Sequence, residues 1–160
     1  MSWMQIQQSP PINDKLLGSN SMQATIHYWP IRIYYEDTDM AGIVYYANYL
    51  KYLERARTEY IRSIGFEQDE LIEQESVVFV VRSVQLDYLK PARFNDQLEV
   101  ATSIEQCKGA SLIFKQTIRQ IEPNHEIIVE AVVKVACLDA SKMCVKAMPK
   151  NMLKQLKNDH

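Results

Sequence analysis

The sequence predicts an α+β domain in which one long helix packs on a face of an antiparallel sheet. Residues 48–64 carry apolar side chains at spacings of three and four, the period of an amphipathic helix. From residue 76 onward, four successive stretches alternate apolar and polar residues between turn-like separators. Strands in this order pair antiparallel, and a single helix covers only one face of the sheet. We therefore expect the molecule to form oligomers through its sheet.

Length and composition indicate one globular domain. The chain has 160 residues, of which 47% are hydrophobic and 24% charged, and its net charge of -2 gives no reason to expect a nucleic-acid partner. No run approaches about 18 apolar residues and no basic end precedes an apolar block, which argues against a membrane span and a secretory signal. The three cysteines form no CxxC pair, which favours a reducing compartment. We predict a cytoplasmic protein.

The N-terminal part of the chain divides into a tail and a first strand. Residues 1–24 are rich in Gln, Ser, Asn and Pro and show no sustained period, so we expect a poorly ordered extension followed by a domain over residues 25–155. β-branched and aromatic residues predict a strand at about residues 26–36, and Pro30 indicates an edge strand or an irregular start.

The helix and the four later strands follow this segment. The helical period begins at Asn48, and Gly65 is well placed to end it. A short second helix is predicted over residues 69–74. The alternating stretches predict strands over residues 76–90, 98–104, 112–118 and 129–137.

Most familiar catalytic motifs are absent from the sequence. There is no GxSxG motif, and the three histidines are too scattered to support a Ser-His-Asp or Cys-His arrangement. No HxxxH, HExxH or paired-cysteine pattern supports a metal site, and no GxGxxG or GxxxxGK[ST] loop is present to bind phosphates. What remains is a group of three carboxylates, Glu36, Asp37 and Asp39, shortly before the helix.

The residues alone leave two interpretations of these carboxylates open. Acids before a helix commonly cap it or favour its positive end. Asp39 also fits a reactive role, because a short apolar run follows it and Gly42 lets the backbone approach a ligand closely. A carboxylate in that place can activate water or attack a carbonyl carbon. Backbone N–H groups at the helix N-terminus can polarise the carbonyl oxygen.

The segment YYEDTDMAGIVYYANYLKYLERARTEY resembles the catalytic segment of the hotdog-fold acyl-CoA thioesterases, in particular the YbgC-like branch and the 4-hydroxybenzoyl-CoA thioesterases. The resemblance continues through VVFVVRSVQLDYLKPARFNDQLEV and ACLDASKMCVKAMP and covers about residues 28–150. It implies an α+β hotdog fold, a long helix wrapped by an antiparallel sheet, assembled as dimers and commonly as tetramers. It also implies hydrolysis of an acyl-CoA thioester to a free acid and CoA, with no metal or redox cofactor.

The same resemblance assigns three catalytic positions. The family's catalytic aspartate falls on Asp39, as a general base or a nucleophile, and a site-lining tyrosine of the preceding strand falls on Tyr35. The YbgC-like branch usually has a histidine where this chain has Tyr46. The 4-hydroxybenzoyl-CoA enzymes carry an aromatic residue there, so Tyr46 is expected to shape the acyl pocket without transferring a proton. Packing in the core or at an interface is the alternative for this tyrosine.

Substrate contacts are implied at further positions, each with a simpler alternative. Glu54 corresponds to an acid that faces the substrate in the aromatic-acyl enzymes, although an ion pair with Arg55 or Arg57 is the default on the polar side of a helix. The CoA phosphates need cations and the pantetheine needs a narrow apolar groove, but each cation taken singly is more typical of a solvated surface. The candidate substrate-binding residues are Gly42, Ile43, Val44, Glu54, the amides of Val78 and Phe79 from a neighbouring subunit, Arg82, Lys90, Lys108 and Lys146.

The sequence thus predicts a cytoplasmic acyl-CoA thioesterase. A hotdog hydratase or dehydratase is the rival enzyme, but those proteins generally pair an acid with a histidine, and no histidine lies near Asp39 in the sequence. A non-catalytic module that binds acyl-CoA or an acyl carrier protein is the rival from another class.

Overall fold

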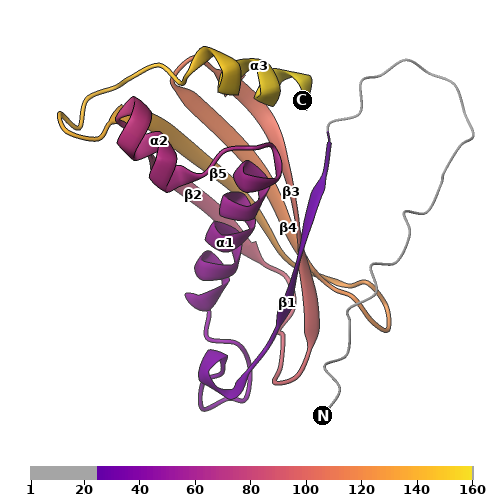
Figure 1. Ribbon diagram of the computed structural model, residues 1–160. Coiled ribbons are helices and arrows are strands. Elements are labelled where there is room, and N and C mark those ends of the chain that lie inside the picture. The colour runs from indigo at the N-terminus through magenta and orange to yellow at the C-terminus, as the bar shows by residue number, and fades with distance from the viewer. Residues whose placement is uncertain (1–24, 160) are drawn as a thin grey trace, which may run out of the picture.

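Figure 1 shows the computed structural model of the chain, in which residues 25–159 are described. The extension predicted over residues 1–24 lies outside the described residues. Five strands form one antiparallel sheet in the order β1-β3-β4-β5-β2. The strands are β1 (His27–Arg32), β2 (Val77–Tyr88), β3 (Gln97–Lys108), β4 (Ser111–Gln120) and β5 (Ile127–Asp139). The predicted fold class is confirmed, and Pro30 lies in the edge strand β1 as expected.

The predicted long helix is α1 (Asn48–Ser63), which lies across one face of the sheet (Figure 1). Its apolar stripe is buried against the strands, with Tyr52, Leu53 and Ala56 almost inaccessible to solvent. Gly65 follows the helix with φ +94°, a backbone conformation that glycine adopts without the strain other residues incur. The short second helix is also confirmed, as α2 (Gln68–Glu75).

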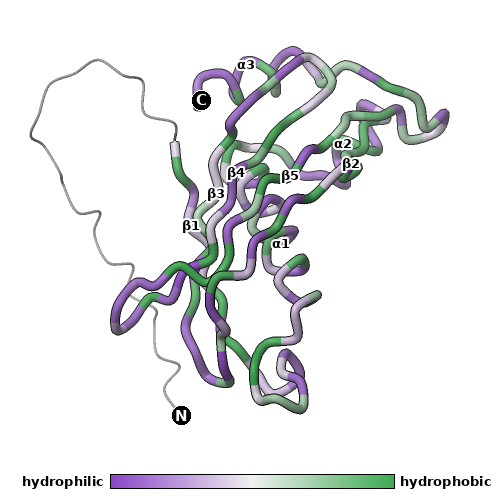
Figure 2. Tube along the Cα trace, turned by 180° about the vertical axis from the view of Figure 1, so that it is seen from behind, coloured by the Kyte–Doolittle hydropathy of each residue, from purple (hydrophilic) through white to green (hydrophobic). Residues whose placement is uncertain are grey.

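Alternation along the strands places apolar side chains under α1 and polar ones on the opposite face. In Figure 2 hydrophobic and hydrophilic residues succeed one another along the strands, and successive residues of a strand point to opposite faces of the sheet. One inward position is polar: Gln116 of β4 is 1% exposed. Its amide donates to the Leu53 carbonyl of α1 at 3.0 Å and to the Thr102 hydroxyl of β3 at 2.9 Å. Its own oxygen accepts an Arg57 N–H at 2.8 Å. This satisfied polar group fixes α1 to the middle of the sheet.

The first predicted strand is shorter than the sequence suggests. β1 ends at Arg32, and residues 35–37 form a 3-10 turn, so Tyr35 does not lie in a strand. The Asp37 carboxylate accepts the Tyr34 N–H at 2.8 Å, and the Asp37 N–H donates to the Tyr34 carbonyl at 3.1 Å. A side chain that bonds the local backbone in this way competes with the sheet for the same groups.

A C-terminal helix, α3 (Lys150–Asn158), was not predicted, and the expected domain boundary at residue 155 falls inside it. With nine residues and three apolar side chains, the helix is too short to show a period in the sequence. Its stability comes from packing, since Met152 and Leu156 are both fully buried at the end of the sheet. The folded unit continues to Asp159, whose carbonyl accepts the Thr25 N–H at 2.9 Å.

We predict that Leu156→Ala lowers the free energy of unfolding by about 2–5 kcal/mol, because it removes a fully buried side chain and leaves a cavity. Lys154→Ala, on the exposed side of the same helix, should change it by no more than about 0.5 kcal/mol. Urea denaturation of both variants measures the difference. If Leu156→Ala lowered the free energy of unfolding no more than this small change, α3 would not contribute to the core.

Candidate active site

Asp39 begins a short closed loop between the 3-10 turn and α1. Thr38 and Val44 form an antiparallel bridge across the base of the loop. Inside it, the Asp39 N–H donates to the Ile43 carbonyl at 2.9 Å, and the Gly42 N–H donates to the Asp39 carbonyl at 3.0 Å. Gly42 has φ +74°, so glycine serves here to close the turn. The backbone around the candidate catalytic residue is therefore held on both sides.

The Asp39 carboxylate points away from the core. The side chain is exposed, and its one described hydrogen bond is from the Ala41 N–H to Oδ1, at 2.8 Å. No ion pair within residues 25–159 involves this carboxylate. One carboxylate oxygen is thus free to accept a proton or to attack an electrophile.

The other two acids of the group have different surroundings. Glu36 is exposed, and none of the hydrogen bonds described for the chain involves its carboxylate. Asp37 is part of the local framework, because its carboxylate bonds the Tyr34 N–H and its carbonyl accepts the Tyr45 N–H at 2.9 Å. The capping interpretation therefore fits Asp37, although the element it caps is the 3-10 turn and not α1.

Backbone donors at the start of α1 are unused, among them those of Tyr46 and Ala47. Within the described residues, neither Tyr46 nor Ala47 donates its N–H in a hydrogen bond. Ala47 occupies the capping position and its side chain makes no capping bond. Unpaired N–H groups at the positive end of a helix form a site for an anion or a polarised carbonyl oxygen. The Asp39 loop leads directly into this end of the helix (Figure 1).

An aromatic groove of about 260 Å³ runs beside the first turn of α1. Tyr46 lies in it, 6.2 Å from the ring of Tyr88, and the Tyr88 hydroxyl donates to the Tyr46 carbonyl at 2.9 Å. The groove is lined by Ile43, Val44, Tyr46, Tyr49, Tyr88, Leu89, Lys90 and Pro91. The structure thus brings four predicted site residues together here: Ile43, Val44, Tyr46 and Lys90.

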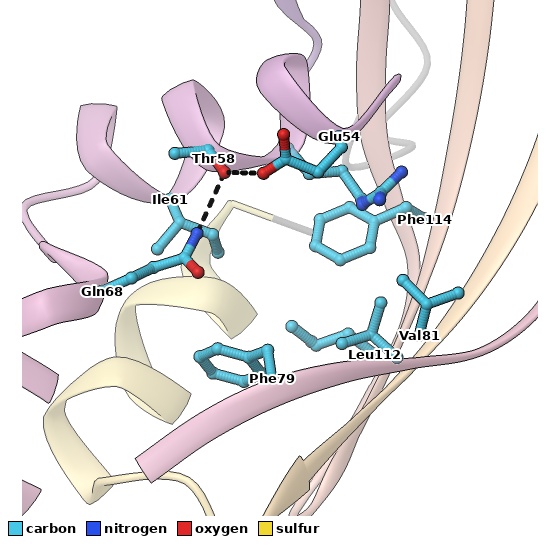
Figure 3. A pocket seen from close by; sticks show the side chains of 10 residues that line it. Glu54, Thr58, Ile61, Gln68, Phe79, Val81, Leu112 and Phe114 are labelled. Atoms are coloured by element: carbon cyan, nitrogen blue, oxygen red, sulfur yellow. Dashed lines mark hydrogen bonds between the residues drawn. The ribbon is translucent and has the colours of Figure 1, made fainter. Parts of the chain in front are cut away.

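A second pocket, of about 90 Å³, lies farther along α1 and opens between this helix and β2 (Figure 3). Glu54 lies at this pocket together with Phe79. The predicted ion pair of Glu54 with an arginine is wrong: its carboxylate accepts the Thr58 hydroxyl at 2.8 Å, and no ion pair of Glu54 is found in residues 25–159. Arg57 instead contacts Gln116, and burial lowers the pKa of its guanidinium.

Several of the predicted site residues line neither the aromatic groove nor the second pocket. Tyr35 stacks on Phe94 at a ring distance of 4.0 Å and is 76% exposed. Arg82 is exposed at the irregularity in the β2–β5 pairing. Lys108 ends β3 at the turn into β4. Lys146 lies 3.6 Å from the Asp139 carboxylate, near the carbonyl of Glu75.

Sequence reasoning did not identify the polar group of Arg57 and Gln116 beneath α1. The available signal was Gln116 itself, a polar residue at an inward position of an otherwise apolar strand face. Residues 25–159 contain no cluster of three metal-binding side chains. No helix in that part of the chain has the length and apolar character needed to cross a membrane.

Comparison with known proteins gives a consistent result. The model of the thioesterase-like superfamily matches residues 34–156. An acyl-CoA thioester hydrolase YbgC from Escherichia coli O157:H7 is 43% identical over 136 residues, which are 85% of this chain and 99% of that protein.

Solved structures with the same fold include further thioesterases. A probable thioesterase from Bartonella henselae has 31% identity and a TM-score of 0.68, covering 78% of this chain and 99% of its own. A 1,4-dihydroxy-2-naphthoyl-CoA thioesterase from Synechocystis has the same fold, with a TM-score of 0.77 at 20% identity over 84% of this chain and 98% of its own. The chain belongs to the thioesterase-like superfamily of hotdog-fold proteins.

Proposed function

We propose that this protein hydrolyses acyl-CoA thioesters, with Asp39 as the general base or nucleophile. The observation that carries the proposal is the free Asp39 carboxylate, held on a closed loop that leads into two unused N–H groups at the start of α1. The acyl-CoA thioester hydrolase from Escherichia coli, similar along almost its whole length, supports the reaction type.

The arrangement assigns a task to each group. The thioester oxygen would accept hydrogen bonds from the N–H groups of Tyr46 and Ala47, which oppose the negative charge that develops on it. Asp39 would take a proton from water as the water attacks the carbonyl carbon, or would attack that carbon itself. In either route the carbon–sulfur bond breaks and the thiolate of CoA leaves. In the water route the thiolate takes up the proton that Asp39 removed from water, and the free acid is released. In the nucleophilic route the acyl group remains on Asp39 as a mixed anhydride, which water then hydrolyses. This hydrolysis releases the acid, restores the Asp39 carboxylate and supplies the proton that the thiolate takes up.

The aromatic groove would hold the pantetheine or the adjoining part of the acyl group, because its lining is mainly apolar and it adjoins the Asp39 loop. Lys90 lies at its edge and forms an ion pair with Glu126 at 2.5 Å, so it would exchange this partner for a CoA phosphate. Arg82, Lys108 and Lys146 lie elsewhere and remain predicted phosphate contacts. No metal or redox cofactor is proposed.

We further propose that the protein acts as a homo-oligomer built on the β2 edge, as a dimer or as a tetramer made of two such dimers. The other sheet edge, β1, has six residues and contains Pro30, which blocks pairing. β2 has twelve residues and no proline, and it exposes Val81 and Val84 at 50% and 40%. A long apolar edge of this kind pairs readily with a second copy.

Pairing of two β2 edges would also complete the site. Tyr88, at the C-terminal end of β2, lies beside Tyr46 at the start of α1, whereas Phe79, near the N-terminal end, lies at the second pocket. A two-fold antiparallel pairing brings one end of β2 opposite the other end in the partner. The Asp39 loop of one copy would then approach Glu54 and the backbone amides of Val78 and Phe79 in the other.

Two expectations from the sequence stay predictions. They are a cytoplasmic location and the use of acyl carrier protein as an alternative carrier of the thioester.

We predict that Asp39→Asn lowers kcat by at least about a hundredfold, because an amide neither takes a proton from water nor attacks a thioester, and general-base help is worth about a hundred- to ten-thousand-fold. Product CoA should bind nearly as tightly as before. Thiol release from acyl-CoA measures kcat, and calorimetric titration with CoA measures binding.

Glu36→Gln is the matched control, since this neighbouring acid makes no described contact. It should keep kcat within about a factor of two, far less than the loss expected of general-base removal. If Asp39→Asn kept more than about a tenth of the parent rate, the assigned role of Asp39 would be wrong.

Tyr46→Phe should retain substantial activity, because the ring shapes the groove and its hydroxyl carries no proton in the proposed reaction. Steady-state kinetics with the same acyl-CoA measures this. A loss as large as that of Asp39→Asn would mean that Tyr46 replaces the histidine of the YbgC-like branch in chemistry as well as in position.

A single charge placed on the exposed β2 edge should both separate the subunits and abolish activity. Val84→Lys is expected to shift the sedimentation coefficient toward that of a monomer, because a buried lysine has no partner across a two-fold edge. Val132→Lys, the same substitution on the neighbouring interior strand β5, is the control for the added charge. An active monomer at assay concentration would contradict the composite site.

A further inference from the structure

One of the points that hold the loop of Asp39 is the backbone carbonyl of Asp37, together with the bridges Thr38–Val44 and Ile43–Arg93. This oxygen accepts two hydrogen bonds, from the Tyr45 N–H and from the side-chain amide of Asn48, both at 2.9 Å. The two donors lie beyond the loop, on the approach to α1 and in its first residue. The carbonyl therefore joins the entry of the Asp39 loop to the start of the helix.

Asn48 is the side chain that makes this connection. It is only 8% exposed, one of three buried polar residues in the described chain. Asparagine at this position does not act as the helix cap, since Ala47 holds that place and no capping bond is formed. A buried amide that bonds neither its own helix nor the sheet, but a loop carbonyl eleven residues earlier, serves to hold that loop.

The Asp37 side chain is held from the opposite direction. Its carboxylate accepts the Tyr34 N–H at 2.8 Å, at the end of the segment that leaves β1. Beneath it lies Tyr52 of α1, which is 1% exposed and whose hydroxyl has no hydrogen bond of good geometry among the described residues. Burial, and next the nearby Asp37 carboxylate, raise the pKa of the Tyr52 phenol well above its usual value. Asp37 thus has little freedom to move.

The position of this junction matters for the chemistry. Asp37 lies two residues before Asp39, and Asn48 directly follows Tyr46 and Ala47, whose N–H groups are unused. The bond from Asn48 to Asp37 therefore spans the two halves of the proposed site, the carboxylate and the carbonyl-binding amides. Displacement of a reacting group by about 1 Å can reduce a rate about a hundredfold.

We infer that Asn48 and Asp37 are positioning residues, which fix the distance between the Asp39 carboxylate and the amides at the start of α1. Neither residue touches the substrate. The inference rests on the proposed function and adds a requirement to it. Asp37 would act through its carbonyl and through the bond between its carboxylate and the Tyr34 N–H, and not through proton transfer.

Asn48→Ala and Asn48→Leu test the inference. The first removes the side chain, and the second keeps an uncharged side chain of similar size without its donor. Both should lower kcat by about 10–100-fold with KM and CoA affinity within about threefold, because the loop loses its side-chain bond to α1 and the binding groove stays in place. If packing alone mattered, Asn48→Leu would keep the parent kcat, and the inference would be overturned.

Two further variants separate positioning from lost stability and from catalysis. Leu156→Ala, at the opposite end of the sheet (Figure 1), should lower the melting temperature at least as far while kcat per folded molecule stays within about twofold. Asp37→Asn keeps the carbonyl and an oxygen that accepts the Tyr34 N–H, so we expect a loss in kcat of no more than about fivefold.

The outcomes distinguish this inference from the proposed function. An Asp37→Asn variant as inactive as Asp39→Asn would make Asp37 a participant in the reaction and would overturn its positioning role. An inactive Asp39→Asn beside a fully active Asn48→Ala would leave the proposed function standing and would overturn the inference alone. An active Asp39→Asn would overturn the proposed function, and the inference with it.

Discussion

The attachment of α1 to the middle of the sheet is the constraint on which the rest of the structure depends. Apolar side chains provide most of the contact, but they do not fix how far along the sheet the helix lies. Gln116 does, because its amide bonds the Leu53 carbonyl of the helix and the Thr102 hydroxyl of β3 at once. A buried amide left without these partners would cost about 1–3 kcal/mol, which penalises any other register of the helix.

The position of α1 in turn places the groups of the site. The helix start lies beside the loop of Asp39 and the C-terminal end of β2, where Tyr46 and Tyr88 contact each other. The middle of the helix lies over Phe79, nearer the other end of β2. The site is thus open toward the unpaired edge of the sheet. In one chain Asp39 is exposed, and exclusion of water from it requires either the substrate or a second copy.

The three acids before α1 all carry a carboxylate, but their surroundings differ. Asp37 is fixed by the backbone on both its carboxylate and its carbonyl, so it serves as a joint between segments. The Asp39 carboxylate accepts one N–H of its own loop, and its second oxygen has no hydrogen-bond partner among residues 25–159. Glu36 faces solvent. One of the three acids is therefore structural, one is solvated, and Asp39 is the candidate for the proposed reaction.

The sequence by itself determined the fold class, α1 and the four later strands, and it singled out Asp39 as the candidate catalytic residue, because periodicity, turn residues and a contiguous motif are local properties of the chain. It could not reveal α3, whose nine residues are stable only through Met152 and Leu156 against the sheet. It also misplaced Tyr35 in a strand, since a bond between Asp37 and the Tyr34 backbone competes with sheet pairing there. The tertiary structure alone decided which distant residues meet: Asn48 with Asp37, Arg57 with Gln116, and Lys90 with the groove beside Tyr46. Such contacts depend on how the helix lies on the sheet, which is set by packing across the whole domain and leaves no pattern in any single segment.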